Sequence, residues 1–128
     1  MLKFKRRINW EMSEQLKKRT KKFALDVIGL SAELPQIVET RHAISQLIRS
    51  SSSVAANYRS ACRGKSKADF ISKMGTVVEE ADETLLWFEL FEDAEVCAPD
   101  KVNKLKSEAD ELLRIFSTAL GTAKHDTR

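Results

Sequence analysis

A cluster of four carboxylates could bind a divalent metal ion: Glu79, Glu80, Asp82 and Glu83. The first and the last of them are four residues apart, so they share one face of a helix. A di-metal site in a helical bundle also needs Glu-x-x-His motifs and glutamates from other helices, because its ligands must surround the ions. The chain has only two histidines, His42 and His125, and no Glu-x-x-His motif. We therefore interpret the cluster as ion-pairing or solvated surface, and we expect neither a metal ion nor another cofactor.

Two kinds of nucleophile occur, and neither has the neighbours that catalysis requires. Ser50–Ser53 form a run of hydroxyls within an expected helix, whereas a nucleophilic serine needs a nearby base and an orienting group. These small side chains are more typical of tight helix packing. Cys62 occupies an apolar position, and nothing beside Cys97 would lower the pKa of its thiol. We assign no catalytic residue and expect a protein that is not an enzyme.

Basic residues are concentrated in the first part of the chain, although the formal net charge is only +3. Residues 1–75 contain 16 Lys and Arg against 6 Asp and Glu, a balance of +10, whereas residues 76–128 contain 6 against 13, a balance of −7. A basic surface attracts polyanions, because neutralised phosphates release their counterions. We therefore predict nucleic-acid contacts by Arg49, Arg59, Arg63, Lys65, Lys67, Lys18 and Lys22. Alternatively, the basic face pairs with an acidic face of the same or a neighbouring subunit.

Four amphipathic helices must position these residues. The chain of 128 residues has the length of one domain, and its 42% of apolar residues suffices for one core. Four glycines, two prolines and 32% charged residues favour long helices over a turn-rich β-fold. Apolar residues recur at helical spacing in four segments. We predict an all-α protein, an antiparallel up-down four-helix bundle over residues 13–124, with a basic N-terminal arm at 1–12 and a frayed tail at 125–128.

Local signals mark the ends of these helices. Ser13 is a candidate N-cap for the first helix, and Pro35 disfavours helix for the residue before it. The second helix, at about 38–63, is expected to end at Gly64 in the left-handed conformation. Ser66 and Asp69 resemble a capping box that starts the third helix. The fourth helix begins at a proline, Pro99, which a first helical turn tolerates.

The end of the third helix carries more apolar residues than a bundle can cover. Six of seven consecutive positions are apolar: Leu85, Leu86, Trp87, Phe88, Leu90 and Phe91. A bundle buries about half of a helix circumference, and large exposed apolar patches mark interaction surfaces. We predict a subunit interface formed by Leu86, Trp87, Leu90 and Phe91, with Gly75 allowing a neighbouring backbone to approach. Alternatively, the first helix or the connection between the third and fourth helices covers this surface.

No segment predicts export or membrane insertion. The first ten residues, MLKFKRRINW, contain positive charges but lack the apolar run of a secretory signal. No stretch approaches the about 18 consecutive apolar residues of a membrane span. The two cysteines lack Cys-x-x-Cys spacing and are expected to be reduced thiols. We therefore expect a cytoplasmic protein without membrane contact.

Three segments resemble one protein family: residues 23–35 (FALDVIGLSAELP), 46–74 (QLIRSSSSVAANYRSACRGKSKADFISKM) and 79–90 (EEADETLLWFEL). The most specific residues are Arg49, Ser53, Asn57, Tyr58, Arg63, Ser66, Asp69, Phe70 and Lys73. The chain is similar here to the small four-helix-bundle proteins encoded in intervening sequences of bacterial large-subunit ribosomal RNA genes. The likeness covers roughly residues 16–92.

This resemblance implies an up-down bundle that assembles as a cyclic oligomer, typically a pentamer, and it implies no catalytic residues. The related accessory proteins of diversity-generating retroelements bind nucleic acid and reverse transcriptase. The family usually has an acidic residue after its Asn-Tyr-Arg element, whereas this chain has Ser60. The loss of that carboxylate makes the region between the second and third helices more basic.

These observations support three functional hypotheses. The first is a non-enzymatic cyclic homo-oligomer, a pentamer, that binds RNA, DNA or a nucleoprotein through its basic face. The second is a scaffold whose basic face docks a protein partner without binding nucleic acid. The third is a metal-dependent hydrolase that uses Glu79, Glu80 and Glu83.

Overall fold

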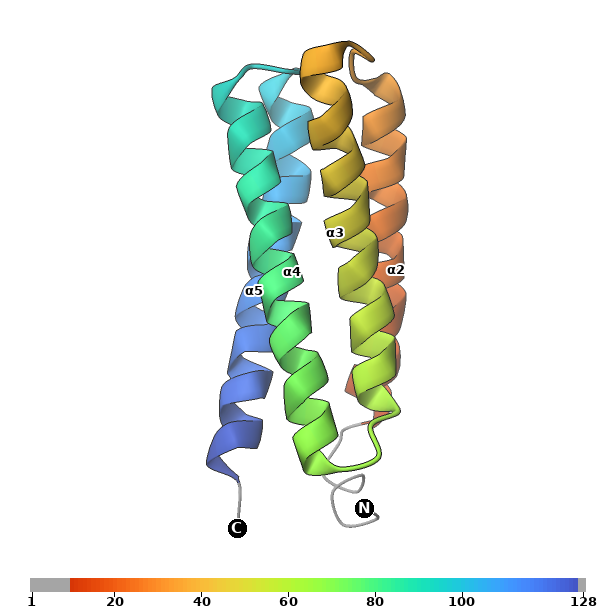
Figure 1. Ribbon diagram of the computed structural model, residues 1–128, viewed down its shortest axis with the longest axis vertical. Coiled ribbons are helices and arrows are strands. Elements are labelled where there is room, and N and C mark those ends of the chain that lie inside the picture. Colours follow the sequence, from red (N-terminus) through yellow and green to blue (C-terminus); the bar gives the residue numbers. More distant parts are fainter. Residues whose placement is uncertain (1–9, 127–128) are drawn as a thin grey trace.

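The computed structural model describes residues 10–126 as four long helices joined by short connections. They are α2 (Trp10–Glu33), α3 (Val38–Cys62), α4 (Lys67–Asp93) and α5 (Pro99–His125). Successive helices run in opposite directions, side by side (Figure 1). The ion pairs Arg19–Glu108 and Lys101–Glu33 join α2 to α5 in the same antiparallel sense. The prediction of an all-α four-helix bundle is confirmed.

The four helices surround one core, with α2 and α4 on opposite sides of it. Both α2 and α4 pack against α3 and against α5, whereas α2 and α4 face each other across the core. One end of the bundle contains the start of α2, the α3–α4 connection and the end of α5 (Figure 1). We call it the corner end. The opposite end contains the α2–α3 and α4–α5 connections, and we call it the distal end.

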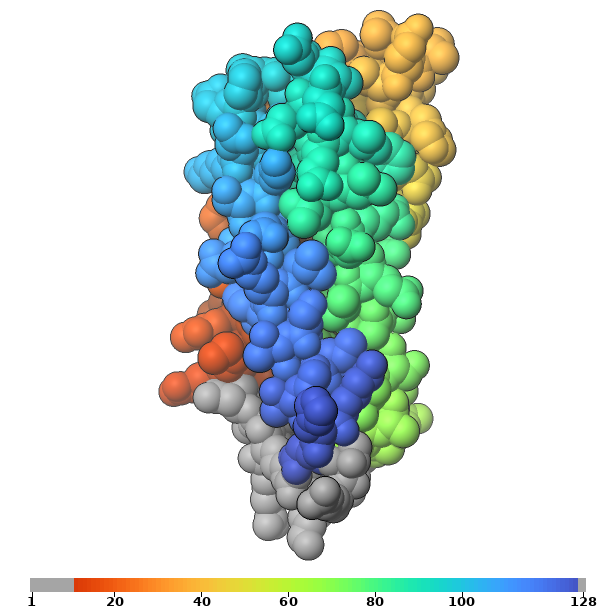
Figure 2. Space-filling model, turned by 90° about the vertical axis from the view of Figure 1, so that its left-hand side faces the viewer, coloured from red at the N-terminus to blue at the C-terminus, as the bar shows by residue number. Residues whose placement is uncertain are grey.

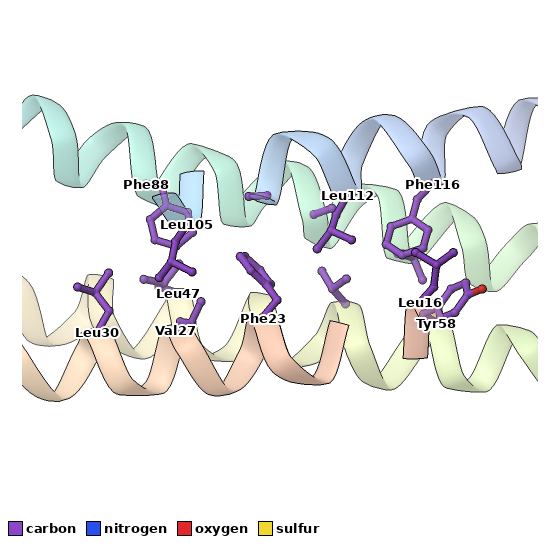
Figure 3. Packing of buried hydrophobic residues seen from close by; sticks show 14 of the residues in the cluster. Leu16, Phe23, Val27, Leu30, Leu47, Tyr58, Phe88, Leu105, Leu112 and Phe116 are labelled. Carbon is purple, nitrogen blue, oxygen red and sulfur yellow. The ribbon is translucent and has the colours of Figure 1, made fainter. Parts of the chain in front are cut away.

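The core consists of the predicted apolar stripes, which meet in layers along the bundle axis (Figure 3). Near the distal end, Leu47 and Phe88 are fully buried and lie at the level of Val27. Near the corner end, the rings of Tyr58 and Phe116 lie 5.0 Å apart, measured between centroids. Aromatic pairs of this kind add about 0.5–1.5 kcal/mol beyond their buried area. Burial of one stripe per helix therefore fixes the rotation of each helix about its axis.

The N-terminal boundary differs from the prediction. Ser13 is not an N-cap, because α2 already begins at Trp10 and Ser13 is a buried residue within it. Residues 10–12 thus belong to the bundle, and the rest of the predicted basic arm lies outside the described residues. At the other end α5 continues to His125. Within residues 10–126, no helix is both long enough and apolar enough to span a membrane.

The apolar end of α4 is divided between the core and the surface. Phe91, predicted at the subunit interface, is 2% exposed and belongs to the core, so that assignment is wrong. Its position three residues after Phe88 places it on the inward face of α4. Trp87 is half-buried, and its indole nitrogen donates to Glu83 Oε2 at 3.2 Å. Leu86 and Leu90 remain exposed and form the part of the predicted interface that the single chain leaves open.

Ser50 and Ser51 are buried between the helices, as predicted for small side chains that allow tight packing, whereas Ser52 of the same run is exposed. The hydroxyl of Thr84 on α4 lies 2.8 Å from the hydroxyl of Ser50 on α3. Each hydroxyl also lies within hydrogen-bonding distance of a carbonyl of its own helix, Leu47 O for Ser50 and Glu80 O for Thr84. Every buried polar atom of this pair is therefore satisfied.

A double-mutant cycle measures this contact. We expect Thr84→Val to lower the free energy of unfolding by about 0.5–1.5 kcal/mol, because it removes the hydrogen bond between α3 and α4 and leaves the Ser50 hydroxyl with the Leu47 carbonyl alone. We expect Ser50→Ala together with Thr84→Val to cost less than the sum of the single changes, with a coupling of about 0.5–1.5 kcal/mol. Urea unfolding followed by circular dichroism measures the cycle. Strict additivity would contradict the contact.

Candidate nucleic-acid interface

Four basic side chains converge where α3 ends and α4 begins. We call this set, Arg59, Arg63, Lys65 and Lys67, the basic corner. The side chains of Arg59, Arg63 and Lys65 are exposed, and that of Lys67 is partly exposed. None of the four forms a salt bridge with a carboxylate of residues 10–126. Their charge is therefore available to an external anion.

A tight turn at Gly64 brings these charges together. The predicted left-handed conformation is wrong, since no glycine has a positive φ in the described part of the chain. Instead, Gly64 N donates to Ala61 O at 2.9 Å, and the turn folds back against the start of α4. A Cβ at residue 64 would lie 3.0 Å from Ala61 O and 3.3 Å from Asp69 Oδ2. Close packing, and not backbone conformation, therefore disfavours a side chain at residue 64.

The carboxylate of Asp69, in the first turn of α4, already has partners in the turn and in its own helix. Ser66 Oγ accepts a hydrogen bond from Asp69 N at 3.1 Å, which confirms Ser66 as the N-cap. The Asp69 carboxylate accepts from Lys65 N at 3.2 Å and pairs with Lys73 at 3.3 Å. The bond from Lys65 N and the pairing with Lys73 lower the pKa of Asp69. This carboxylate serves the turn and its own helix, so it forms no ion pair with the arginines of the basic corner.

Arg49 does not belong to the basic corner. It lies earlier in α3, closer to the distal end. Its guanidinium forms salt bridges with Glu80, at 2.8 Å, and with Glu83 on α4. Its assignment to nucleic-acid binding is thus not supported by its surroundings. The same pairs confirm that two glutamates of the acidic cluster form ion pairs.

The two predicted lysines of α2 also lie outside the basic corner. Lys22 is engaged with Asp26 at 2.7 Å, one turn along its own helix. Lys18 is exposed on the outward face of α2 and has no salt bridge within the described residues.

Sequence reasoning missed Lys124. The last turn of α5 contains Lys124 and His125, and it lies at the corner end of the bundle (Figure 1). Both side chains are exposed, and Lys124 has no salt bridge in residues 10–126. The antiparallel order of four helices was the available signal, because it places the end of the fourth helix beside the start of the third.

The remaining reactive groups do not form a second site. In residues 10–126, no group of three or more His, Cys, Asp or Glu side chains could hold a metal ion. Cys62 is a buried core thiol, as predicted. Burial first, and the neighbouring Cys62 second, raise the pKa of the Tyr58 hydroxyl. Burial also raises the pKa of the Cys97 thiol. The raised pKa values disfavour the ionised, nucleophilic forms of the Tyr58 hydroxyl and the Cys97 thiol.

Comparison with known proteins identifies the family. The chain matches the model of the 23S rRNA-intervening sequence protein family over residues 12–118. This chain belongs to that family. The match extends through most of the bundle and includes the basic corner. A search of curated proteins finds no match.

A solved structure confirms the fold of this 23S rRNA-intervening sequence protein. It is the crystal structure of a protein with unknown function from the S23 ribosomal protein family of Bacteroides thetaiotaomicron. The two chains are 25% identical, and their structures superpose with a TM-score of 0.76. The alignment covers 85% of this chain and 97% of that protein, so the likeness extends over most of the bundle.

A glycine substitution tests the turn of the basic corner. We expect Gly64→Ala to lower the free energy of unfolding by about 1–3 kcal/mol, because the new methyl group lies 3.0 Å from the backbone oxygen of Ala61, closer than an ordinary contact. Gly121→Ala is the matched control, since a Cβ at Gly121 meets nothing within 4 Å. That change should instead stabilise α5 by about 0.5–1 kcal/mol. Chemical denaturation compares the two variants, and equal effects would contradict the close packing at Gly64.

The Arg49–Glu83 pair predicts a loss of stability in acid. Burial alone would raise the pKa of Glu83, but hydrogen bonds from Arg49 and Trp87 outweigh it and hold the pKa below its usual value. A lowered folded-state pKa stabilises the protein above the unfolded value of about 4.3, and this contribution disappears as the pH falls through the folded value. We expect Glu83→Gln to remove about 0.5–1 kcal/mol at pH 7 and less in acid.

Unfolding by urea between about pH 7 and pH 3 measures this dependence. Glu39→Gln serves as the control, because Glu39 is exposed and forms no salt bridge with the described residues. An unchanged pH profile in Glu83→Gln would show that the pair contributes nothing.

Proposed function

We propose that this member of the 23S rRNA-intervening sequence protein family is a non-enzymatic, homo-oligomeric protein of the cytoplasm that binds RNA through the basic corner. One observation carries the proposal. Four basic side chains lie around one turn without a salt bridge to a carboxylate of residues 10–126, whereas Arg19, Arg49, Lys101 and Lys106 are engaged in ion pairs. Such a site favours a ligand that supplies many negative charges, and a phosphate backbone is such a ligand.

The distribution of charge along the bundle gives the orientation of binding. The distal end carries Glu92, Asp93, Glu95 and Asp100 around the α4–α5 connection. The corner end carries the basic corner and Lys124. A polyanion is attracted to one end and repelled from the other, so the bundle approaches a phosphate backbone with its corner end first. The protein contacts the phosphate backbone of the RNA, so charge contributes more to binding than the identity of the bases does.

The exposed part of α4 supports the homo-oligomeric part of the proposal. Leu86 and Leu90 are 50% and 44% exposed, one turn apart on the outward face. Adjacent exposed leucines of this kind mark an interaction surface. The resemblance described above implies a ring of five copies, and the ring size is a prediction that native mass spectrometry measures.

Filter binding tests the RNA contact. We expect a labelled single-stranded RNA to be retained at about 50 mM salt and released as salt is raised. Arg59→Glu with Lys65→Glu should weaken binding at least tenfold and reduce the salt dependence, by about 0.7 in log–log slope for each lost phosphate contact. A labelled DNA of the same sequence, measured in parallel, shows whether the sugar contributes.

The matched control is Arg41→Glu with Lys104→Glu. These residues are exposed, form no salt bridge with the described carboxylates and lie towards the distal end, and the double change alters the net charge equally. We expect it to bind RNA nearly as the natural chain does. An equal loss in both double variants would contradict a localised site. No retention at low salt, together with oligomers disrupted by the corner variant, would favour the protein scaffold instead.

A further inference from the structure

An apolar surface is exposed at the distal end of the bundle. Val38, the first residue of α3, is 79% exposed, and Ile37 before it is 52% exposed. His42, one turn after Val38, contacts Trp87 of α4 with ring centroids 6.2 Å apart, so the start of α3 lies beside the end of α4. Figure 2 shows the start of α3 (amber) next to the end of α4 (green-blue). The two connections at this end therefore belong to one surface.

This end of the bundle has an excess of carboxylates. Residues 33–39 and 92–100 contain six Asp and Glu and no Lys or Arg. Two of the six pair with lysines of α5, and the exposed Arg41 and Lys104 offset only part of the remaining charge. The other four carboxylates are exposed and form no salt bridge within residues 10–126: Glu39, Asp93, Glu95 and Asp100. We call these four residues, together with Ile37 and Val38, the distal surface.

The segment before α2 has the complementary composition. Residues 1–9 lie outside the described part of the chain, and they contain four Lys and Arg and no Asp or Glu. Its sequence Leu-Lys-Phe-Lys-Arg-Arg-Ile, residues 2–8, combines three apolar residues with the four basic ones. A partner of the distal surface must supply both apolar contact and positive charge. This segment supplies both within seven residues.

The basic segment cannot reach the distal surface of its own chain. It is attached at the corner end, where α2 begins (Figure 1). The 24 residues of α2 extend over about 36 Å at about 1.5 Å per residue. Lys3 precedes Trp10 by seven positions, which extend over at most about 25 Å at about 3.6 Å per residue. A distal surface that binds this segment therefore belongs to a second copy.

The exposed apolar residues of α2 suit this segment less well. Leu25 and Ile28 are 57% and 49% exposed. Lys18 and Lys21 lie on the same face of α2, are exposed and have no salt bridge among the described residues. These lysines repel a basic segment, whereas the carboxylates of the distal surface attract it.

We propose that residues 2–8 of one copy bind the distal surface of a second copy. The apolar residues of the segment pack against Ile37 and Val38, and its basic residues pair with the four carboxylates. The contact joins two different surfaces, so it is heterologous and repeats from copy to copy. It links bundles end to end, with all of them pointing in one direction. It depends neither on RNA nor on the exposed leucines of α4.

A synthetic peptide of residues 1–9 tests this contact. The receiving protein is the full chain with a neutralised segment, which leaves its distal surface free: Lys3→Ser, Lys5→Ser, Arg6→Ser and Arg7→Ser. We expect the fluorescently labelled peptide to bind saturably at about 50 mM salt and to be released as salt is raised. Fluorescence anisotropy measures binding to protein that has been freed of nucleic acid by nuclease treatment. Absence of saturable binding would overturn the proposal.

Two variants of the receiving protein locate the site. Asp93→Lys with Glu95→Lys changes the distal surface and should weaken peptide binding at least tenfold. Glu79→Lys with Asp82→Lys is the matched control, because these acids are exposed, form no salt bridge with the described residues and lie on the outward face of α4. The control should bind the peptide nearly as its parent does, and circular dichroism verifies that both variants remain helical. A loss in the control as large as in the distal variant would overturn the assignment.

Two comparisons at constant charge test the apolar part of the contact. A peptide with Leu2→Ser, Phe4→Ser and Ile8→Ser should bind at least fivefold more weakly than the natural peptide. Val38→Ser in the receiving protein should weaken binding of the natural peptide several-fold. Unchanged affinity in either comparison would reduce the contact to general charge attraction and overturn the inference.

Light scattering tests the contact between whole chains. We expect the mean mass of the natural chain to rise with concentration above that of the chain with the neutralised segment, because end-to-end contacts do not close. Equal masses at every concentration would overturn the contact. A peptide that fails to bind while the natural chain retains RNA would overturn this inference and leave RNA binding intact, whereas a bound peptide without RNA retention would do the reverse.

Discussion

Each helix of this bundle can bury only one stripe of side chains, and the four buried stripes share one narrow core. Phe23 of α2 and Phe88 of α4 lie with ring centroids 6.3 Å apart across that core, so the rotation of one helix is set by the others. This constraint decides which residues reach solvent. Leu86 is exposed because Phe88 is buried, and Arg59 is exposed because its neighbour Tyr58 is buried. The candidate interfaces are consequences of the core.

Ion pairs then divide the basic residues into two classes. Arg19 connects α2 to Glu108 and Glu111, and these partners raise the pKa of its guanidinium further above an already high value. Lys101 and Lys106 connect α5 to carboxylates of α2 and α4. Such surface pairs contribute little stability individually. They neutralise part of the positive charge on the sides of the bundle, whereas the four side chains of the basic corner form no salt bridge within residues 10–126.

The sequence predictions were correct for features that depend on neighbouring residues, and they were less successful for features that depend on packing in the folded chain. The helices, their buried stripes and the cap at Ser66 were predicted correctly, because periodicity and capping are local properties of the chain. Gly64 was recognised as a helix end, but the reason for glycine was wrong, because the spacing of residues does not show how tightly the turn packs against Ala61 and Asp69. Phe91 was misplaced although its spacing of three residues from Phe88 already puts both on one face of α4, and that face is the buried one. The exposed pair Leu25 and Ile28 was missed because a single apolar residue on a polar face gives no signal.

The sequence by itself determined the fold class, the order of the helices and the unequal division of charge along the chain, since these depend on composition and on spacing within one helix. Only the tertiary structure decided which charges are free. The partners of Arg49 are Glu80 and Glu83, far along the chain, and only the packing of α3 on α4 brings them together. Likewise, Lys124 joins the corner end because α5 returns antiparallel to α4. Ion pairs and surfaces depend on distances between helices, and those distances exist only after the core has formed.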